Sequence, residues 1–195
     1  MNSLTKYCHY VLSLEKDKDP ENKIYHDTEY GFTLKSDDEL FGRLILEINQ
    51  AGLSWTTILR KKENFRKAYK DFSIKKISKF SEKDFERLMN DAGIIRNRLK
   101  INAAIHNANV IICLQKEFGS FQNWLHSHHP KSLEEWTKLF KKTFVFVGGE
   151  IVNEFLMSTG YLEGAHGPGC PIYKKALKSK PAWNSKKKRR STIQK

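Results

Sequence analysis

The chain has 195 residues, of which 39% are hydrophobic and 12% aromatic, and its formal net charge is +13. A chain of this size can bury roughly 70% of the surface that it exposes when unfolded, and its aromatic content excludes a wholly disordered protein. No apolar run approaches the roughly 20 residues that span a bilayer, and no secretory signal is visible. Three cysteines are too few for a disulfide framework. We therefore expect an intracellular protein without a membrane partner.

Helical periodicity dominates the chain, and serines at 36, 81 and 132 each precede an acidic residue by three positions. This spacing is typical of a capping box, in which serine and carboxylate satisfy free backbone N–H groups. Apolar residues at helical spacing then predict helices near 40–48, 55–65, 85–89, 101–112, 121–125, 133–140 and 149–159. We expect a tight turn at 144–147, because a single short strand would have no partner. The predicted fold class is all-α, with irregular structure over about the first 30 residues.

Most of the positive charge lies at the C-terminal end. Residues 174–195 contain ten basic side chains and no acidic one. Such dense like charge resists folding, so we expect one domain at 1–173 and a mobile tail at 174–195. The tail either binds a polyanion by releasing counterions from phosphates or only keeps the chain soluble. Composition leaves both open.

Two residues that can bind metal lie in a glycine- and proline-rich loop, His166 and Cys170. Zinc prefers four nitrogen and sulfur ligands in a tetrahedron, and Cys8 and His26 could supply the other two. Alternatively, His166 and Cys170 are ordinary loop residues. Cys113 lies in an apolar helical stretch, where we expect it to be a small core side chain.

Glu47 is the acidic residue with the most unusual position. On a helix it projects about 20° from Leu40, at the edge of the apolar stripe. A carboxylate there is either paired with a cation or faces a pocket. The aromatic residues Tyr25, Tyr30 and Trp55 are either core side chains or rings that stack on a nucleobase.

Several stretches together resemble the 3-methyladenine DNA glycosylase I (Tag) family. They are residues 25–31, 47–55, 91–98 and 146–148, followed by the His-x3-Cys pair at 166 and 170. The similarity runs from about residue 8 to residue 173, and the order and spacing of these stretches make it specific. The basic tail lies outside it.

The resemblance implies an all-α, helix-hairpin-helix glycosylase fold whose two ends are joined by zinc. The implied zinc ligands are Cys8, His26, His166 and Cys170. The implied base pocket contains Tyr25, Glu47 and Trp55, with Glu47 as the catalytic carboxylate. The implied DNA contacts are Leu53, which would fill the gap left by a flipped base, and Gly148 and Gly149 in a hairpin at 144–149.

The resemblance also implies a cytoplasmic, monomeric repair enzyme that removes 3-methyladenine from double-stranded DNA. Glu150 lies near the position that bifunctional relatives fill with lysine, so we expect no strand-cleaving lyase step. Asn22 replaces a usual pocket tyrosine, Tyr30 a common tryptophan, and Ala165 a frequent aspartate. These departures keep two alternatives open: a non-catalytic protein that binds alkylated DNA, and a zinc-stabilised helical module that binds nucleic acid.

Overall fold

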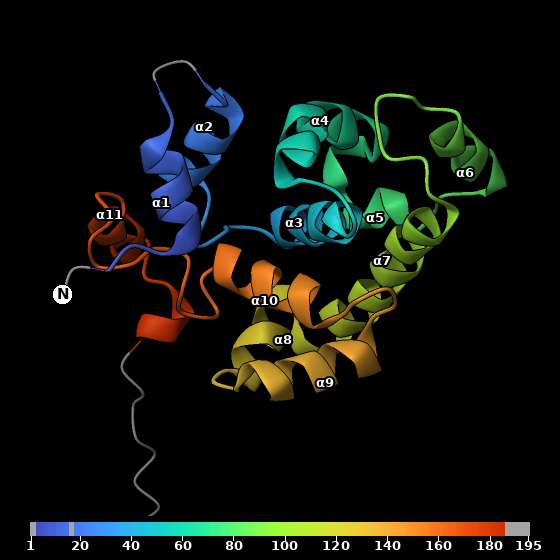
Figure 1. Cartoon of the computed structure of the whole chain (residues 1–195). Coiled ribbons are helices and arrows are strands. Elements are labelled where there is room, and N and C mark those ends of the chain that lie inside the picture. Colours follow the sequence, from blue (N-terminus) through green and yellow to red (C-terminus); the bar gives the residue numbers. More distant parts are fainter. Residues whose placement is uncertain (1–2, 16–17, 186–195) are drawn as a thin grey trace, which may run out of the picture.

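A computed structural model describes residues 3–15 and 18–185 and confirms the all-α fold class (Figure 1). The α-helices are α1 (Lys6–Ser13), α2 (Pro20–Thr28), α3 (Asp37–Gln50), α4 (Trp55–Ala68), α5 (Ile74–Ile77), α6 (Glu82–Met89), α7 (Arg98–Phe118), α8 (Phe121–His128), α9 (Leu133–Thr143), α10 (Gly149–Ser158) and α11 (Tyr173–Lys178). Two 3-10 turns, η1 (Lys70–Phe72) and η2 (Ala182–Asn184), complete the described elements. None of these helices is both long and apolar enough to cross a membrane.

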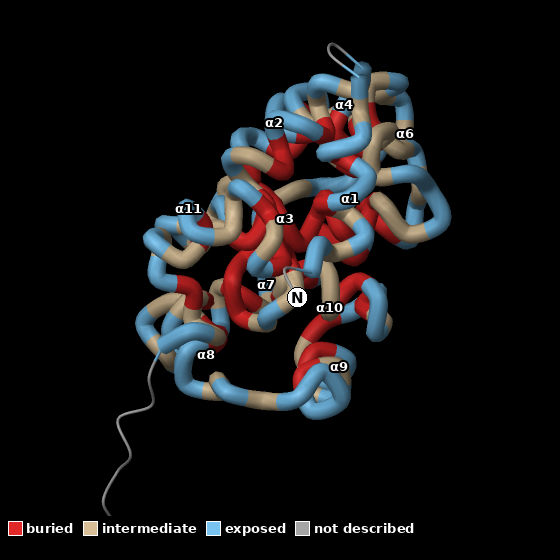
Figure 2. Tube along the Cα trace, turned by 60° about the vertical axis from the view of Figure 1, so that its left-hand side comes forward, coloured by how far each residue is buried: buried red, intermediate tan, exposed pale blue. Residues whose placement is uncertain are grey.

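Helix α3 is the centre of the core, where α4, α7, α8 and α10 pack against it (Figures 1 and 2). Its start is set by a capping box: Ser36 accepts from the Glu39 N–H at 3.2 Å, and the Glu39 carboxylate accepts from the Ser36 N–H at 3.0 Å. All ten side chains from 40 to 49 are buried. They include the charged residues Arg43 and Glu47, which on a helix buried on all sides need polar partners or a cavity.

The expectation of an irregular N-terminal segment is wrong, because α1 and α2 form there. Thr5 caps α1 by accepting from the Cys8 N–H at 3.2 Å, and Pro20 occupies the first turn of α2, where its missing N–H costs nothing. The two helices pack against each other, and α2 also packs on α4. The Lys175 ammonium of α11 donates to the Asp27 carbonyl of α2 at 2.9 Å, so segments from the two halves of the chain meet here.

The mobile tail was expected to begin at residue 174, but the structure is folded beyond that point. Residues 173–178 form α11, and the following segment is bonded to the body of the protein. The Thr33 hydroxyl donates to the Ser179 carbonyl at 2.8 Å, and the Trp183 N–H donates to the Gly160 carbonyl at 3.3 Å. Folded structure therefore continues to residue 185, and the rest of the predicted tail, 186–195, lies outside the described residues. The interpretation of Cys113 as a core side chain is wrong too, since it is exposed.

The turn predicted at 144–147 joins α9 to α10. Asn107 of α7 fixes it: its side chain accepts from the Val145 N–H at 3.0 Å and donates to the Val145 carbonyl at 3.1 Å. Phe146, at the tip, has a left-handed φ of 57°. These two hydrogen bonds with the Asn107 side chain satisfy the backbone N–H and carbonyl of Val145, which a neighbouring strand would otherwise do.

Candidate active site and metal centre

The described part of the chain contains a cavity of about 530 Å³. Its walls come from α1, α2, α3, α4 and α10, so it joins the N-terminal helices to the centre of the fold. Most of the lining residues are aromatic or acidic, and none is basic: Tyr7, Tyr25, Tyr30, Glu47, Gln50, Ala51, Gly52, Trp55, Glu150, Ile151 and Glu154.

Glu47 lines this cavity and is only 3% exposed. Arg43, one turn earlier on α3, donates instead to the Tyr25 hydroxyl and, at 3.2 Å, to the Glu29 carboxylate. Within residues 3–15 and 18–185 no cation forms an ion pair with Glu47. Of the two readings of its position, the structure therefore favours the pocket over the ion pair. Burial raises the pKa of Glu47 to about 8, although Arg43 acts in the opposite direction.

Two of the expected aromatic residues form adjoining walls beside this carboxylate. The Tyr25 and Trp55 rings lie 5.1 Å apart, centroid to centroid, with their planes inclined by 60°. The Arg43 guanidinium lies over the Tyr25 ring, 4.7 Å from its centroid. The indole N–H of Trp55 is buried without a hydrogen-bond partner among the described residues.

Tyr7 is a wall residue that the sequence analysis did not find. It comes from α1, its ring lies 5.1 Å from that of Tyr30, and its hydroxyl donates to Asn22 Oδ1 at 2.8 Å. Asn22 is buried and its amide donates onward to Asp19 and Thr56. The absence of an aromatic side chain at 22 was the only sequence signal, and it did not show which residue takes that space.

Helix α10 contributes two further carboxylates, which the sequence analysis had not placed in the pocket. Glu150 and Glu154 stand one turn apart and both line the cavity. The Tyr30 hydroxyl donates to Glu154 Oε2 at 3.1 Å. Three glutamates thus face one space that contains no lysine or arginine, so its field favours a cation.

The expected DNA-contacting residues lie at the edges of the cavity and do not line it. Leu53 is 39% exposed in the loop between α3 and α4, and the Lys100 ammonium fixes this loop by donating to the Asn49 and Ala51 carbonyls at 2.9 and 2.7 Å. Gly148 and Gly149 begin α10, where a Cβ at either position would meet no atom within 4 Å. The N-terminal amides of α10 are therefore accessible.

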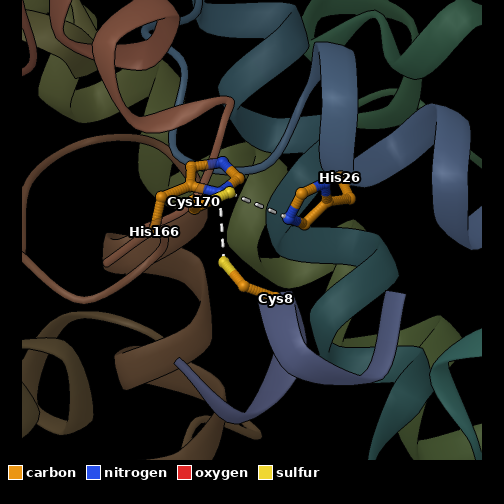
Figure 3. Close-up of side chains that lie close together, drawn as sticks. All are labelled: Cys8, His26, His166 and Cys170. Carbon is orange, nitrogen blue, oxygen red and sulfur yellow. Dashed lines mark hydrogen bonds between the residues drawn. The ribbon is translucent and has the colours of Figure 1, made fainter. Parts of the chain in front are cut away.

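Cys8, His26, His166 and Cys170 come together from the two ends of the chain (Figure 3). All four are buried, and one potential ligand atom from each lies within 4.8 Å of the others. His166 Nδ1 lies 3.4 Å from Cys8 Sγ and 3.5 Å from Cys170 Sγ, and His26 Nε2 lies 3.5 Å from Cys170 Sγ. In a tetrahedral zinc site, nitrogen and sulfur ligands stand about 3.6 Å apart. These four residues can therefore hold a metal ion.

Neighbouring groups orient both imidazoles toward this cluster. His166 Nε2 lies 2.7 Å from the Tyr30 carbonyl, an acceptor, so Nε2 carries the proton and Nδ1 is free to bind metal. His26 Nδ1 lies 2.7 Å from the Asp27 carboxylate, which leaves Nε2 free in the same way. Such outer partners are the usual companions of histidine ligands. Gly167 fits here because a Cβ would meet the Ser3 carbonyl oxygen at 2.0 Å.

Comparison with known proteins gives consistent similarities. The sequence profile of the family described as methyladenine glycosylase matches residues 15–138. DNA-3-methyladenine glycosylase 1 of Escherichia coli (strain K12) is 35% identical, over 80% of this chain and 93% of that protein. The DNA-3-methyladenine glycosylase of Haemophilus influenzae is 33% identical, over 75% and 89% of the two chains.

Solved structures agree with these relatives. A crystal structure of 3-methyladenine DNA glycosylase I superimposes with a TM-score of 0.72 and 32% identity, over 82% of this chain and 97% of that one. The Staphylococcus aureus 3-methyladenine DNA glycosylase I gives a TM-score of 0.73 and 32% identity, over 80% and 92%. A variant of such an enzyme in complex with 3-methyladenine gives 0.73 and 32%, over 80% and 93%.

Proposed function

This chain belongs to the methyladenine glycosylase family, and we propose that it hydrolyses the N-glycosidic bond of 3-methyladenine in alkylated double-stranded DNA. The observation that carries the proposal is a buried glutamate, Glu47, that has no ion-pair partner in the described residues and lies beside aromatic rings in a cavity. A base within a duplex cannot reach such a cavity, so the damaged nucleotide must first swing out of the helix.

Glu47 recognises the positive charge of the lesion. Methylation at N3 makes adenine cationic, and a carboxylate that accepts from its N–H groups forms a charge-assisted hydrogen bond. An undamaged base brings no such charge and leaves Glu47 uncompensated in a buried site. The cationic ring is also a good leaving group, so the enzyme needs less acid catalysis than one that removes a normal base.

Tyr25, Trp55 and Tyr7 provide the apolar walls for the purine. An electron-poor cationic ring is attracted to aromatic faces, and stacking is worth about 1–3 kcal/mol per base. Tyr7 compensates for the absence of an aromatic side chain at Asn22, because the amide of Asn22 holds the Tyr7 hydroxyl. The aromatic enclosure is therefore rearranged rather than lost.

The DNA duplex binds across the edges of the cavity. Leu53 fills the gap left by the extruded base, as apolar wedges do in proteins that bend DNA. Gly148 and Gly149 bring the first amides of α10 against backbone phosphates, an anion site that needs close backbone approach. We propose that the protein acts on this substrate as a monomer in the cytoplasm.

Zinc is the metal that best suits the Cys8, His26, His166 and Cys170 cluster. Two sulfur and two nitrogen ligands with no position left for water are typical of structural zinc. The ion would join α1, α2 and the loop before α11, and it would take no part in the reaction. Its contribution to activity is indirect, since Tyr7 and Tyr25 are chain neighbours of two of the ligands.

The reaction ends with an abasic site. A lyase step needs an amine that attacks C1′, and the residues lining the cavity include no lysine. Glu150 stands on the first turn of α10, where an amine would be needed to reach the sugar. We therefore expect an intact phosphodiester backbone after base release.

Release of free 3-methyladenine from freshly methylated duplex DNA tests the proposal. Chromatography of the released bases should show 3-methyladenine above the rate of spontaneous loss, and Glu47→Gln should lower the enzymatic release about 100-fold or more. Tight binding of methylated DNA without release would instead identify a non-catalytic binding protein. Equal binding of methylated and unmethylated DNA would identify a general nucleic-acid-binding module.

A further inference from the structure

The cavity contains more negative charge than recognition of one cationic ring requires. Glu47 lies on α3, while Glu150 and Glu154 lie one turn apart on α10, which packs against α3. Burial raises the pKa of Glu47 and of Glu154, and a neighbouring carboxylate adds to each increase: Glu154 acts on Glu47, and Glu150 acts on Glu154. Such an arrangement is unfavourable unless the ligand carries positive charge at more than one place.

The three carboxylates differ in depth. Glu47 is 3% exposed, Glu154 is half-buried, and Glu150 is exposed on the first turn of α10. A flipped nucleotide enters the cavity base first, so its base lies deepest and its sugar stays nearer the DNA backbone. With Glu47 at the base, the carboxylates of α10 lie on the side of the cavity that continues to the hairpin glycines.

Of the two carboxylates on α10, Glu154 is better placed to act on a bound nucleotide. It faces Tyr30, Glu47 and Glu150, and the Tyr30 hydroxyl fixes one of its oxygens at 3.1 Å. Its other oxygen makes no hydrogen bond or ion pair within the described part of the chain. A partly desolvated carboxylate that is held by a tyrosine and faces a cavity has the features of a catalytic group.

We propose that Glu154 is a second catalytic carboxylate, which faces the sugar of the flipped nucleotide. Cleavage of the bond between C1′ and N9 moves the bonding pair into the purine, which leaves as neutral 3-methyladenine, and positive charge develops on the sugar. Glu154 stabilises that charge and accepts a proton from the water whose oxygen bonds to C1′. Substrate, water and carboxylate thus give free base, abasic sugar and protonated Glu154.

This inference rests on the proposed function, and its test separates base binding from bond cleavage. Glu154→Gln should slow single-turnover release of 3-methyladenine from duplex DNA by about 100-fold, the lower range for acid–base catalysis. Binding of free 3-methyladenine, followed by quenching of tryptophan fluorescence, should change by about twofold or less, because the free base has no sugar. Glu117→Gln removes the same charge from an exposed site on α7 and serves as the matched control.

A second variant distinguishes catalysis from structural support. In Glu154→Ala, added formate should restore part of the release rate, since formate can occupy the vacated space and accept a proton. Unchanged release by Glu154→Gln would overturn the inference, and so would loss of free-base binding as large as the loss of rate. If the wild-type protein itself releases no 3-methyladenine, the proposed function fails as well, which the same assay shows directly.

Discussion

The phenol of Tyr7 donates a hydrogen bond to Asn22 Oδ1 across 2.8 Å, and this bond attaches α1 to the wall of the cavity. The Asn22 amide in turn donates to Asp19 Oδ2 at 2.8 Å, and the Tyr10 hydroxyl donates to the same oxygen at 2.7 Å. Asn22 of α2 therefore holds in place an aromatic side chain that α1 supplies to the cavity.

Tyr7→Ala should weaken binding of free 3-methyladenine about tenfold, because it removes one stacking wall. Tyr7→Phe keeps the ring and loses only the bond to Asn22, so its affinity should fall by about threefold or less. Tyr10→Ala, which changes a tyrosine on the same helix that does not line the cavity, is the control. Equal effects of the Tyr7 and Tyr10 variants would show that Tyr7 only stabilises α1.

The ionisation of Glu47 should control the pH dependence of excision. Burial raises its pKa to about 8, so the carboxylate that pairs with the cationic base becomes more populated as pH rises. We therefore expect kcat/KM for 3-methyladenine release to rise from about pH 6, to reach half of its maximum near pH 8, and to level off above about pH 9. The Glu47→Gln enzyme should be slow and lack this rise. A rise of the same size in both proteins would assign it to another group.

The raised pKa of Glu47 also affects stability, which should fall as pH rises, whereas activity should increase. The folded protein holds a proton on Glu47 that the unfolded chain releases near pH 4.5, so this stabilisation is complete below pH 4.5 and is lost as pH rises through about 8. Glu47→Gln has no charge to bury. Its melting temperature should therefore exceed that of the wild type most clearly at pH 8 to 9, and a variant that melts lower there would contradict the assignment.

Loss of the metal should disorganise the ends of the chain before the core. Cys170→Ser should lower the zinc content, measured by elemental analysis, and lower both melting temperature and affinity for 3-methyladenine, because Tyr7 and Tyr25 adjoin two of the ligands. Cys113→Ser, which changes an exposed cysteine, should retain zinc and stability. Wild-type protein purified without zinc or another bound metal would refute the assignment of this cluster.

Local sequence signals predicted the central helices well. The capping box of Ser36 and Glu39 and the apolar stripe that follows are short-range features, and they placed α3 with Glu47 at its boundary. The N-terminal helices were missed because α1 and α2 are short and their stability depends on the far end of the chain. Cys8 meets His166 only in the folded protein, and no local pattern of residues 6–28 shows that contact.

The residues of the candidate site also divide into those that the sequence predicted and those that it missed. Tyr25, Glu47 and Trp55 lie in stretches that match the family, and the structure brings them to one cavity. Tyr7 and Glu154 enter that cavity because α1 and α10 pack beside α3, which is a tertiary arrangement without a sequence motif. Acidic residues on a helix usually face water, so Glu154 carried no signal of its own.

Two truncations separate the role of the basic residues 186–195 from that of the folded segment 174–185. Removal of residues 186–195 deletes six lysines and arginines but leaves α11 and η2 complete. Because neutralised phosphates release counterions, this variant should bind undamaged duplex more weakly at low salt and with a shallower dependence on salt, while single-turnover excision stays unchanged.

Removal of residues 174–195 should instead lower the melting temperature as well, since it also deletes Ser179 and Trp183, which bond to Thr33 and Gly160. Affinity measured against salt concentration, together with thermal unfolding, separates the two effects. Identical salt dependence in the full chain and the shorter deletion would show that the terminal charges do not contact DNA.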